Sequence, residues 1–479
     1  MDLRKIFSLI PEVKKPEDKK VDFNVKLKWT LIVLISFFVL ANISLFGLSE
    51  NALSRFKYLA VILGTDFGSI ISLGIGPIVM ASIILQLLVG SGLMKIDISN
   101  KEGKRFYQGI QKLFVLFFIL FEAVIYVAMG GLQALPGLSW LLILQLILGG
   151  ILIYYMDDLT QKWGFGSGVS LFIGAGVSWR IFTELFQFID VQGKNCLADF
   201  AGTPCAGKIF IILQSVTSGA PTELLAAVAS IVSTVIIFLI VVWAQSLKVE
   251  IPLSFDRLRG YGIKWPLSFF YSSVMPVILI SALIANVQLF AGMVENAAMP
   301  CFTDGGVCEG GAKIASNFVW LGRFQNGQPI EGMSFWISST NLLELTIRGG
   351  FMLKFFLQGL IHILVFMALA IIFAIFWVKT SGMDAKAQAE KISASGLKVS
   401  GFRQDNRVLE AILDRYIMPL TIMGGAAIGL LASVTDLLGA IVGGTSILLV
   451  IMIMYQFFQS IIQQHQTDMN PLLRKFVGG

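Results

Sequence analysis

Charge is scarce in this chain of 479 residues: Asp, Glu, Lys and Arg together make up 14% of it, where an ordinary soluble domain has about 25%. Hydrophobic residues make up 56%, and Phe alone occupies 38 positions. The cores of soluble domains cannot bury so much apolar surface, so a large part of it must face lipid. The composition therefore excludes a soluble enzyme, a disordered protein and a small disulfide-rich domain.

Histidine and cysteine are also rare. Two His residues argue against a proton relay or a multi-histidine metal centre. The four cysteines follow no zinc-ribbon spacing, and they allow three disulfide connectivities. Pairing of sequence neighbours, Cys196 with Cys205 and Cys301 with Cys308, would close two short loops. Such disulfides require the oxidising face of a membrane or a hyperthermophilic source, and four free thiols are the alternative.

Catalytic signatures are missing as well. The sequence has no H-E-x-x-H, no Walker A motif and no G-x-S-x-G. The glycine-rich stretch Gly164-Phe-Gly-Ser-Gly168 lacks the Lys of a phosphate loop and leads into an apolar segment. We therefore expect no enzymatic activity and no cofactor, and any driving energy must come from a partner or an ion gradient.

Ten apolar segments approach the length of about 20 residues that a membrane-spanning helix needs. The first, with its apolar run from Leu31 to Leu48, is too long for the core of a signal peptide. The sequence thus predicts an all-α polytopic membrane protein. Its ten spans are 29–48, 74–93, 110–130, 139–157, 168–187, 223–243, 269–290, 355–377, 417–437 and 446–464.

Basic residues gather on one side of this arrangement. Of the 36 Lys and Arg, 27 fall in segment 1–28, in the even-numbered connections or in the tail 465–479. Short loops rich in Lys and Arg stay in the cytoplasm. Both termini and the long loops 244–268 and 378–416 are therefore predicted to be cytoplasmic, and strand-like and Gly-rich pieces in these loops suggest protruding hairpins.

Five spans precede the polar loop 188–222 and five follow it. An odd number of spans gives the halves, 29–187 and 223–464, opposite orientations, which is the geometry of an inverted repeat. The loop 188–222 would be an external hinge, and the loop 291–354 would also be external. All four cysteines then lie outside.

Segment 52–67 is apolar in its middle but too short to cross a membrane. It carries Arg55 and Asp66 near its ends, and we interpret it as a half-helix re-entering from outside. An amphipathic helix on the membrane surface is the alternative. The glycines and proline of Leu73-Gly-Ile-Gly-Pro77 place irregular backbone at membrane depth, which is tolerated only where it is buried or lines a cavity.

Ionisable groups inside predicted spans are few. Glu122 lies mid-span, and Asn286 of the seventh span could face it or a pore. Polar residues satisfied within the bundle are the alternative. A secondary transporter would need more such groups. A conduit for varied substrates would instead use an apolar constriction, and the pairs Ile75/Val79 and Val169/Ile173 have the right spacing, although core packing explains such pairs too.

Motifs along essentially the whole chain resemble the SecY family of protein-conducting channels, in its archaeal type. They include Leu73-Gly-Ile-Gly-Pro-Ile-Val79, Gln86-Leu-Leu-Val-Gly-Ser-Gly92, Val249-Glu-Ile-Pro-Leu253 and Lys398-Val-Ser-Gly-Phe-Arg403. The resemblance implies a clamshell of two five-helix halves around an hourglass pore. Such a channel passes unfolded secretory polypeptides and releases transmembrane segments sideways into lipid.

The resemblance also implies roles for individual residues. The lateral gate between the second and seventh spans would use the polar residues Glu122 and Asn286. Segment 52–67 would be the plug. The apolar pore ring would be Ile75, Val79, Val169, Ile173, Ile278 and Leu449. The plug residues are Arg55, Leu59, Ile62 and Asp66.

Partners follow from the resemblance in the same way. Arg257, Arg259, Lys398 and Arg403 match ribosome-docking positions, and arginines on hairpins suit RNA phosphates. Topology alone would also explain these charges. The other implied partners are single-span subunits of the SecE type and of the SecG or beta type, the signal recognition particle receptor, signal peptides, nascent chains and lipid. The implied location is the plasma membrane. For the function, a scaffold that only anchors ribosomes is a further alternative.

Overall fold

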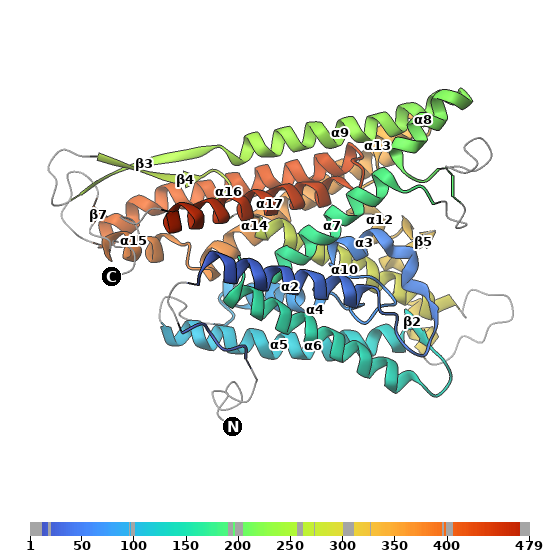
Figure 1. Cartoon of the computed structure of the whole chain (residues 1–479), viewed down its shortest axis with the longest axis horizontal. Helices are drawn as coiled ribbons and strands as arrows, with labels where there is room; N and C mark the ends of the chain where they lie inside the picture. Colours follow the sequence, from blue (N-terminus) through green and yellow to red (C-terminus); the bar gives the residue numbers. More distant parts are fainter. Residues whose placement is uncertain are drawn as a thin grey trace.

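In the computed structural model, the described residues form a helical bundle with three small sheets (Figure 1). The residues that it describes are 12–17, 21–94, 96, 101–189, 195–196, 205–255, 262–272, 274–299, 311–325, 327–394, 397–398 and 406–469.

Nine helices of the described residues are long and apolar enough to cross a membrane. A tenth predicted span is occupied by the shorter helix α4, Gly76–Gly90. The prediction of an all-α fold with ten spans is therefore confirmed. The nine long helices are α2 (Phe23–Ala41), α5 (Lys101–Ala128), α6 (Ser139–Trp163), α7 (Gly168–Phe186), α9 (Pro221–Gln245), α10 (Met275–Ala298), α14 (Leu353–Thr380), α16 (Asn406–Leu437) and α17 (Gly444–Met469).

Short elements connect the spans of the first half. Strand β1 (Leu48–Asn51) pairs with β2 (Leu132–Ala134) in antiparallel fashion. The 3-10 helix η1 (Ala52–Phe56) and the helix α3 (Lys57–Ile62) follow β1 directly. The region predicted as a half-helix is thus helical over eleven residues in two pieces.

The two loops predicted to be external contain more regular structure than the sequence suggests. Helix α8 (Lys208–Ser218) lies within 188–222. Within 291–354, α10 continues to Ala298 and further short elements follow. They are α11 (Gly311–Ser316), η3 (Val319–Leu321), β5 (Arg323–Gln325), β6 (Gln328–Glu331), α12 (Met333–Ile337) and α13 (Leu342–Ile347).

A three-stranded sheet joins the two long basic loops. Strands β3 (Lys248–Phe255) and β4 (Gly262–Ser268) form an antiparallel hairpin. Strand β7 (Leu397–Lys398), which follows α15 (Ala385–Ala394), pairs with the far end of β3. In Figure 1 this sheet and α15 lie at one end of the bundle, whereas α8, β2 and β5 lie at the other.

Several helices run beyond the predicted spans. Helix α5 begins at Lys101 and α16 at Asn406, about three turns before the apolar segments predicted from hydropathy. Hydropathy detects only the part of a helix that is apolar, whereas helix-forming residues such as Glu, Lys and Arg continue it into water. These extensions carry helical structure toward the end of the bundle that holds the three-stranded sheet.

The two halves share one continuous hydrophobic core, which includes buried residues of α4 and α7 from the first half and of α10 and α17 from the second. The start of α2 and the end of α17 are also tied together. The Lys26 ammonium donates to Gln464 Oε1 at 3.1 Å, and Gln464 Nε2 donates to the Val21 carbonyl at 3.1 Å. The first and last described spans therefore meet at the same end of the bundle.

Candidate pore, plug and gate

All six side chains assigned to the pore ring are buried, with exposed fractions of 8% or less, and all lie in the shared core. Ile75 and Val79 lie at the start of α4, and Ile278 lies in the first turn of α10. Val169 and Ile173 belong to the first two turns of α7, as Leu449 does in α17. The six residues assigned to the ring therefore lie at the beginnings of four helices.

A positional repeat relates these helix starts across the halves. In α4 and in α10, the second and seventh spans, Pro77 and Pro276 lie near the first position, and Val79 and Ile278 follow two residues later. Proline suits a first turn because the missing N–H would be unpaired there. This repeat is not evident from the sequence alone, since it consists of single positions within unrelated surroundings.

The segment with the plug assignment lies inside the molecule. Phe56 and Leu59 are fully buried, and Ile62 is half-buried. The Phe56 ring meets the Phe324 ring edge to face, with centroids 5.2 Å apart. Helix α3 contacts α7 of its own half and α10 of the other. A surface helix, the alternative interpretation, does not fit this burial.

The end of this segment is bonded to the start of α4. The Ile75 amide donates to the Leu63 carbonyl at 2.9 Å, and the Thr65 hydroxyl donates to the Ile71 carbonyl at 2.6 Å. Asp66 is exposed. The side chain of Arg55 lies outside the described residues.

The two polar residues assigned to the gate are both buried but are not bonded to each other. Neither carboxylate oxygen of Glu122 has a hydrogen-bond partner within the described part of the chain. The amide of Asn286 donates to the Ala282 carbonyl of its own helix at 2.9 Å. Glu122 instead approaches α4 so closely that a Cβ on Gly76 would lie 3.0 Å from Oε2. Of the two expectations for Asn286, that it faces Glu122 or a pore, the first is not supported by a hydrogen bond between the two side chains.

Helix α4 contacts both α10 and α14 of the second half. The interface between the second span and the seventh and eighth spans is therefore closed in this conformation.

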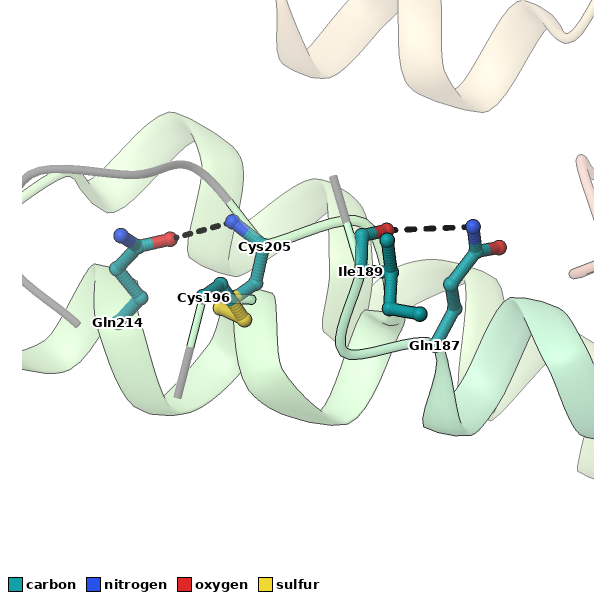
Figure 2. The surroundings of a disulfide bond; sticks show 5 residues. All are labelled: Gln187, Ile189, Cys196, Cys205 and Gln214. Carbon is teal, nitrogen blue, oxygen red and sulfur yellow. Dashed lines mark hydrogen bonds between the residues drawn. A yellow bond between two sulfur atoms is a disulfide. The ribbon is translucent and has the colours of Figure 1, made fainter. Parts of the chain in front are cut away.

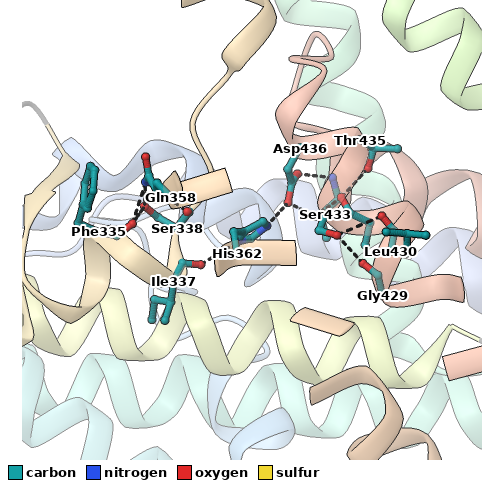
Figure 3. A network of polar contacts seen from close by, with 12 residues as sticks. Phe335, Ile337, Ser338, Gln358, His362, Gly429, Leu430, Ser433, Thr435 and Asp436 are labelled. Carbon is teal, nitrogen blue, oxygen red and sulfur yellow. Dashed lines mark hydrogen bonds and ion pairs between the residues drawn. The ribbon is translucent and has the colours of Figure 1, made fainter. Parts of the chain in front are cut away.

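A polar network links α14, α16 and the short helix α12 (Figure 3). His362 Nδ1 lies 2.8 Å from the Ile337 carbonyl, and His362 Nε2 lies 3.5 Å from Asp436 Oδ2. One turn earlier in α14, Gln358 Nε2 donates to the Phe335 carbonyl at 2.7 Å. These residues are far apart along the chain, so no sequence pattern connects them.

Cys196 and Cys205 form a disulfide, with Cα atoms 5.3 Å apart (Figure 2). This is one of the two predicted neighbour pairs. The amide of Cys205 donates to Gln214 Oε1 of α8 at 3.1 Å, so the bridge is held against that helix. Cys301 and Cys308 lie outside the described residues.

The ribosome-docking assignment rests mostly on residues outside the described part: Arg257, Arg259 and Arg403. Lys398 belongs to β7, paired with Ser254 of β3, although its side chain is not described. Backbone pairing therefore joins the loop that holds Lys398 to the hairpin of β3 and β4. Arg257 and Arg259 fall between these two strands in the sequence.

The N-terminal stretch of residues 12–17 contacts Lys112 of α5 and the C-terminal end of α6. Glu12 pairs with Lys112 and with Lys162, and the Val13 amide donates to Asp158 Oδ2 at 3.0 Å. The hydrogen bond from Lys112 lowers the pKa of Glu12 below its ordinary value, against a smaller opposing effect of burial. No group of side chains in the described residues is arranged to hold a metal ion.

Ten spans in two halves, with a buried segment between them, define a polytopic membrane protein with the architecture of a gated channel. Residues 69–458 match the family model for SecY, and the chain belongs to the SecY family. The family that the sequence motifs indicate is therefore confirmed.

Relatives and solved structures agree over nearly the whole length. The protein translocase subunit SecY of Methanothermobacter thermautotrophicus is 41% identical over 478 residues, 99% of this chain and 98% of that protein. A SecY structure, described as showing that the plug domain stabilises the closed state of the translocation channel and maintains a membrane seal, has a TM-score of 0.78. It is 33% identical, with 98% and 99% of the two chains covered.

Sec61 in the canine ribosome-channel complex from the endoplasmic reticulum has a TM-score of 0.75 and is 32% identical. The comparison covers 98% of this chain and 99% of that chain.

Proposed function

We propose that this chain is the pore-forming subunit of a protein translocase. It passes unfolded secretory polypeptides across the membrane and releases transmembrane segments laterally into lipid. The observation that carries the proposal is the segment 52–63, in which Phe56, Leu59 and Leu63 are buried. Its helix α3 contacts both α7 and α10, and its end is hydrogen-bonded to the helix start at Ile75. A helical bundle without a pore needs no such segment between its halves, whereas a channel at rest needs a segment that closes its pore.

The six buried side chains from Ile75 to Leu449 form the constriction of this channel. Aliphatic side chains have no hydrogen-bonding groups, so they do not hold a passing polypeptide of any composition, and a narrow apolar ring excludes ions by dewetting. The segment 52–67 is the plug above the ring. Opening displaces it and breaks the bond between Leu63 and Ile75.

Lateral release takes place between α4 and the pair α10 and α14. Glu122 and Asn286 lie beside this interface, and the buried carboxyl of Glu122, without a partner among the described residues, lowers the stability of the closed arrangement. A hydrophobic signal segment that enters there replaces the contacts between these helices with contacts to itself.

The basic end of the bundle is cytoplasmic, as are both termini, and the membrane is the plasma membrane. Arg257, Arg259, Lys398 and Arg403 bind ribosomal RNA phosphates, with an affinity that falls as salt rises. Single-span subunits of the SecE type and of the SecG or beta type complete the channel, and the signal recognition particle receptor delivers ribosomes to it. The chain itself is not an enzyme.

Ion conductance in planar bilayers tests the ring. The triple variant Ile75→Gly, Val79→Gly, Ile278→Gly is expected to raise the resting conductance severalfold. The matched control is Ile153→Gly, which removes an equally buried side chain of α6 outside the ring. Unchanged conductance in the triple variant, or an equal rise in the control, contradicts the assignment.

Crosslinking tests passage of a polypeptide. A stalled nascent chain in reconstituted vesicles is expected to react with a photoprobe at Ile75 or Leu449 and not with one at Ile153. If no probe reacts and a small solute binds saturably unless Glu122 is changed to Gln, the protein is a secondary transporter instead.

A further inference from the structure

The fourth and fifth spans of each half are joined by the same contact. In the first half, Asp157 of α6 accepts a hydrogen bond from the Val169 amide at the start of α7, at 3.1 Å. In the second half, Asp436 of α16 accepts one from the Thr445 amide at the start of α17, at 2.6 Å. In both cases the amide belongs to the second residue of the fifth span.

A glycine makes each contact possible. A Cβ on Gly168 would lie 2.6 Å from Asp157 Cα, and a Cβ on Gly444 would lie 1.9 Å from the Thr435 carbonyl carbon and 2.3 Å from the Asp436 nitrogen. The backbone of the fifth span therefore touches the fourth span directly at its first residue. We call this pairing of an aspartate with a glycine the aspartate clasp.

The clasps stand at a fixed distance from the ring. Ile173 follows Gly168 by five residues, and Leu449 follows Gly444 by five residues. In an α-helix, five residues correspond to a rise of about 7.5 Å. The height of each side chain along the pore is thus set by where its helix begins.

We propose that Asp157 and Asp436 are equivalent positioning residues, each of which fixes the start of its α-helix and thereby places Ile173 or Leu449 in the ring. This inference rests on the proposed function, because it gives the clasps a task in sealing the pore. A carboxylate suits the position, since the first amides of a helix have no partner within it and carry positive partial charge.

The burial of these aspartates supports a specific role. Asp157 is only 5% exposed, and Gln161 donates to its second oxygen at 2.8 Å. The side chain of Asp436 is 12% exposed and accepts bonds from both the amide and the hydroxyl of Thr445. Carboxylates within membrane spans are expensive and are kept where they act.

The two clasps differ in one respect. Asp436 also lies 3.5 Å from His362, which reaches toward it from α14 (Figure 3). Asp157 is bonded within α6 and to the start of α7 only, among the bonds of the described residues. The second clasp is therefore linked to the gate helix α14, and the first is not.

Resting conductance tests the proposal. Asp157→Ala and Asp436→Ala are each expected to raise the ion leak severalfold, because the unfastened helix shifts and leaves a gap in the ring. Asp157→Asn and Asp436→Asn retain an acceptor oxygen and are expected to restore most of the seal. The matched control is Asp158→Ala, which removes the neighbouring carboxylate that pairs with Lys162 instead of with a helix start.

Hydrogen exchange at Val169 and Thr445 supplies a local readout. Faster exchange of these amides in the alanine variants, together with the leak, supports the proposal. Faster exchange with an unchanged leak overturns it, because the clasp would then cap the helix without placing the ring. Should an alanine variant fail to accumulate, Gly168→Ala and Gly444→Ala push the same helix starts away and must leak likewise.

Failure of the clasp proposal can be distinguished from failure of the proposed function. If the triple ring variant leaks and the clasp variants do not, the ring stands and the clasp proposal fails. If the triple ring variant does not leak, the ring itself fails, and the clasp proposal fails with it.

Discussion

The amide nitrogen of Ile75 lies 2.9 Å from the carbonyl oxygen of Leu63 and donates a hydrogen bond to it. Leu63 belongs to segment 52–67, which is assigned as the plug, and Ile75 directly precedes α4 and is itself assigned to the ring. Gly74, directly before Ile75, has a φ of +54°, and a Cβ at that position would lie 2.3 Å from the Leu63 oxygen. The packing of this segment against the start of α4 thus depends on a close backbone contact that only glycine permits.

Replacing Gly74 with Ala is expected to open this contact. The added methyl group displaces the carbonyl of Leu63, so the bond to Ile75 is lost and the plug shifts away from α4. We expect a severalfold rise in resting ion conductance of reconstituted channels and earlier crosslinking of signal peptides.

Gly92 supplies the matched control for this change. Its φ of +80° is equally unfavourable for alanine, but no other atom lies within 4 Å of the Cβ position. Gly92→Ala therefore carries the backbone strain without the collision. A leak of the same size in both variants would show that strain, and not the plug contact, is responsible.

Glu122 is expected to destabilise the closed state. Both of its oxygens are buried without a hydrogen-bond partner in the described part of the chain, and an unsatisfied buried polar group costs about 1–3 kcal/mol. Glu122→Leu should therefore raise the melting temperature in detergent and slow the opening of the gate by signal peptides.

Asp157→Leu is the comparison, because Asp157 is a buried carboxylate whose oxygens do accept hydrogen bonds. It should lower the melting temperature. A fall in both variants would mean that Glu122 is satisfied in the membrane.

The docking of residues 12–17 is expected to depend on pH. Glu12 has a pKa lowered from its ordinary value of 4.5, chiefly by the hydrogen bond from Lys112. A lowered pKa in the docked state means that ionised Glu12 favours docking. This contribution is complete above pH 4.5 and is lost as the pH falls through the lowered pKa.

A spin label at Glu17→Cys, an exposed position of the same stretch, reports this docking. Its mobility should rise in acid and return at neutral pH. Adding Glu12→Gln should make the label mobile at every pH. A label that remains immobile with Gln at position 12 would show that other bonds hold the stretch. These include the bond from the Val13 amide to Asp158, the bond from Lys162 to the Val13 carbonyl and the bond from Trp163 Nε1 to the Lys14 carbonyl.

The disulfide between Cys196 and Cys205 should contribute to stability as a unit. Closing a loop of this length contributes about 2–3 kcal/mol. Cys196→Ser and Cys205→Ser should each lower the melting temperature by the same amount, and the double variant should lower it no further. Additive losses would indicate that the two thiols act separately.

Hydropathy and charge were sufficient to predict the ten spans, because these depend on composition over many residues. Strand-like and Gly-rich pieces in the loop 244–268 indicated the hairpin of β3 and β4. The plug contact was not predictable, since it depends on the φ of Gly74 and on a backbone bond to Leu63. The lack of a partner for Glu122 within the described residues also required coordinates. His362 and Asp436 meet only because α14 and α16 lie side by side.

The bonds of Gln464 to Lys26 and Val21 fasten the first span to the last on the side where α17 also contacts α7 and α9. If the halves part at α4 and α10 while this seam persists, the motion is a rotation about an axis close to α17. Displacement then grows with distance from that axis, so a few degrees at the seam give the widest opening at the interface that faces lipid.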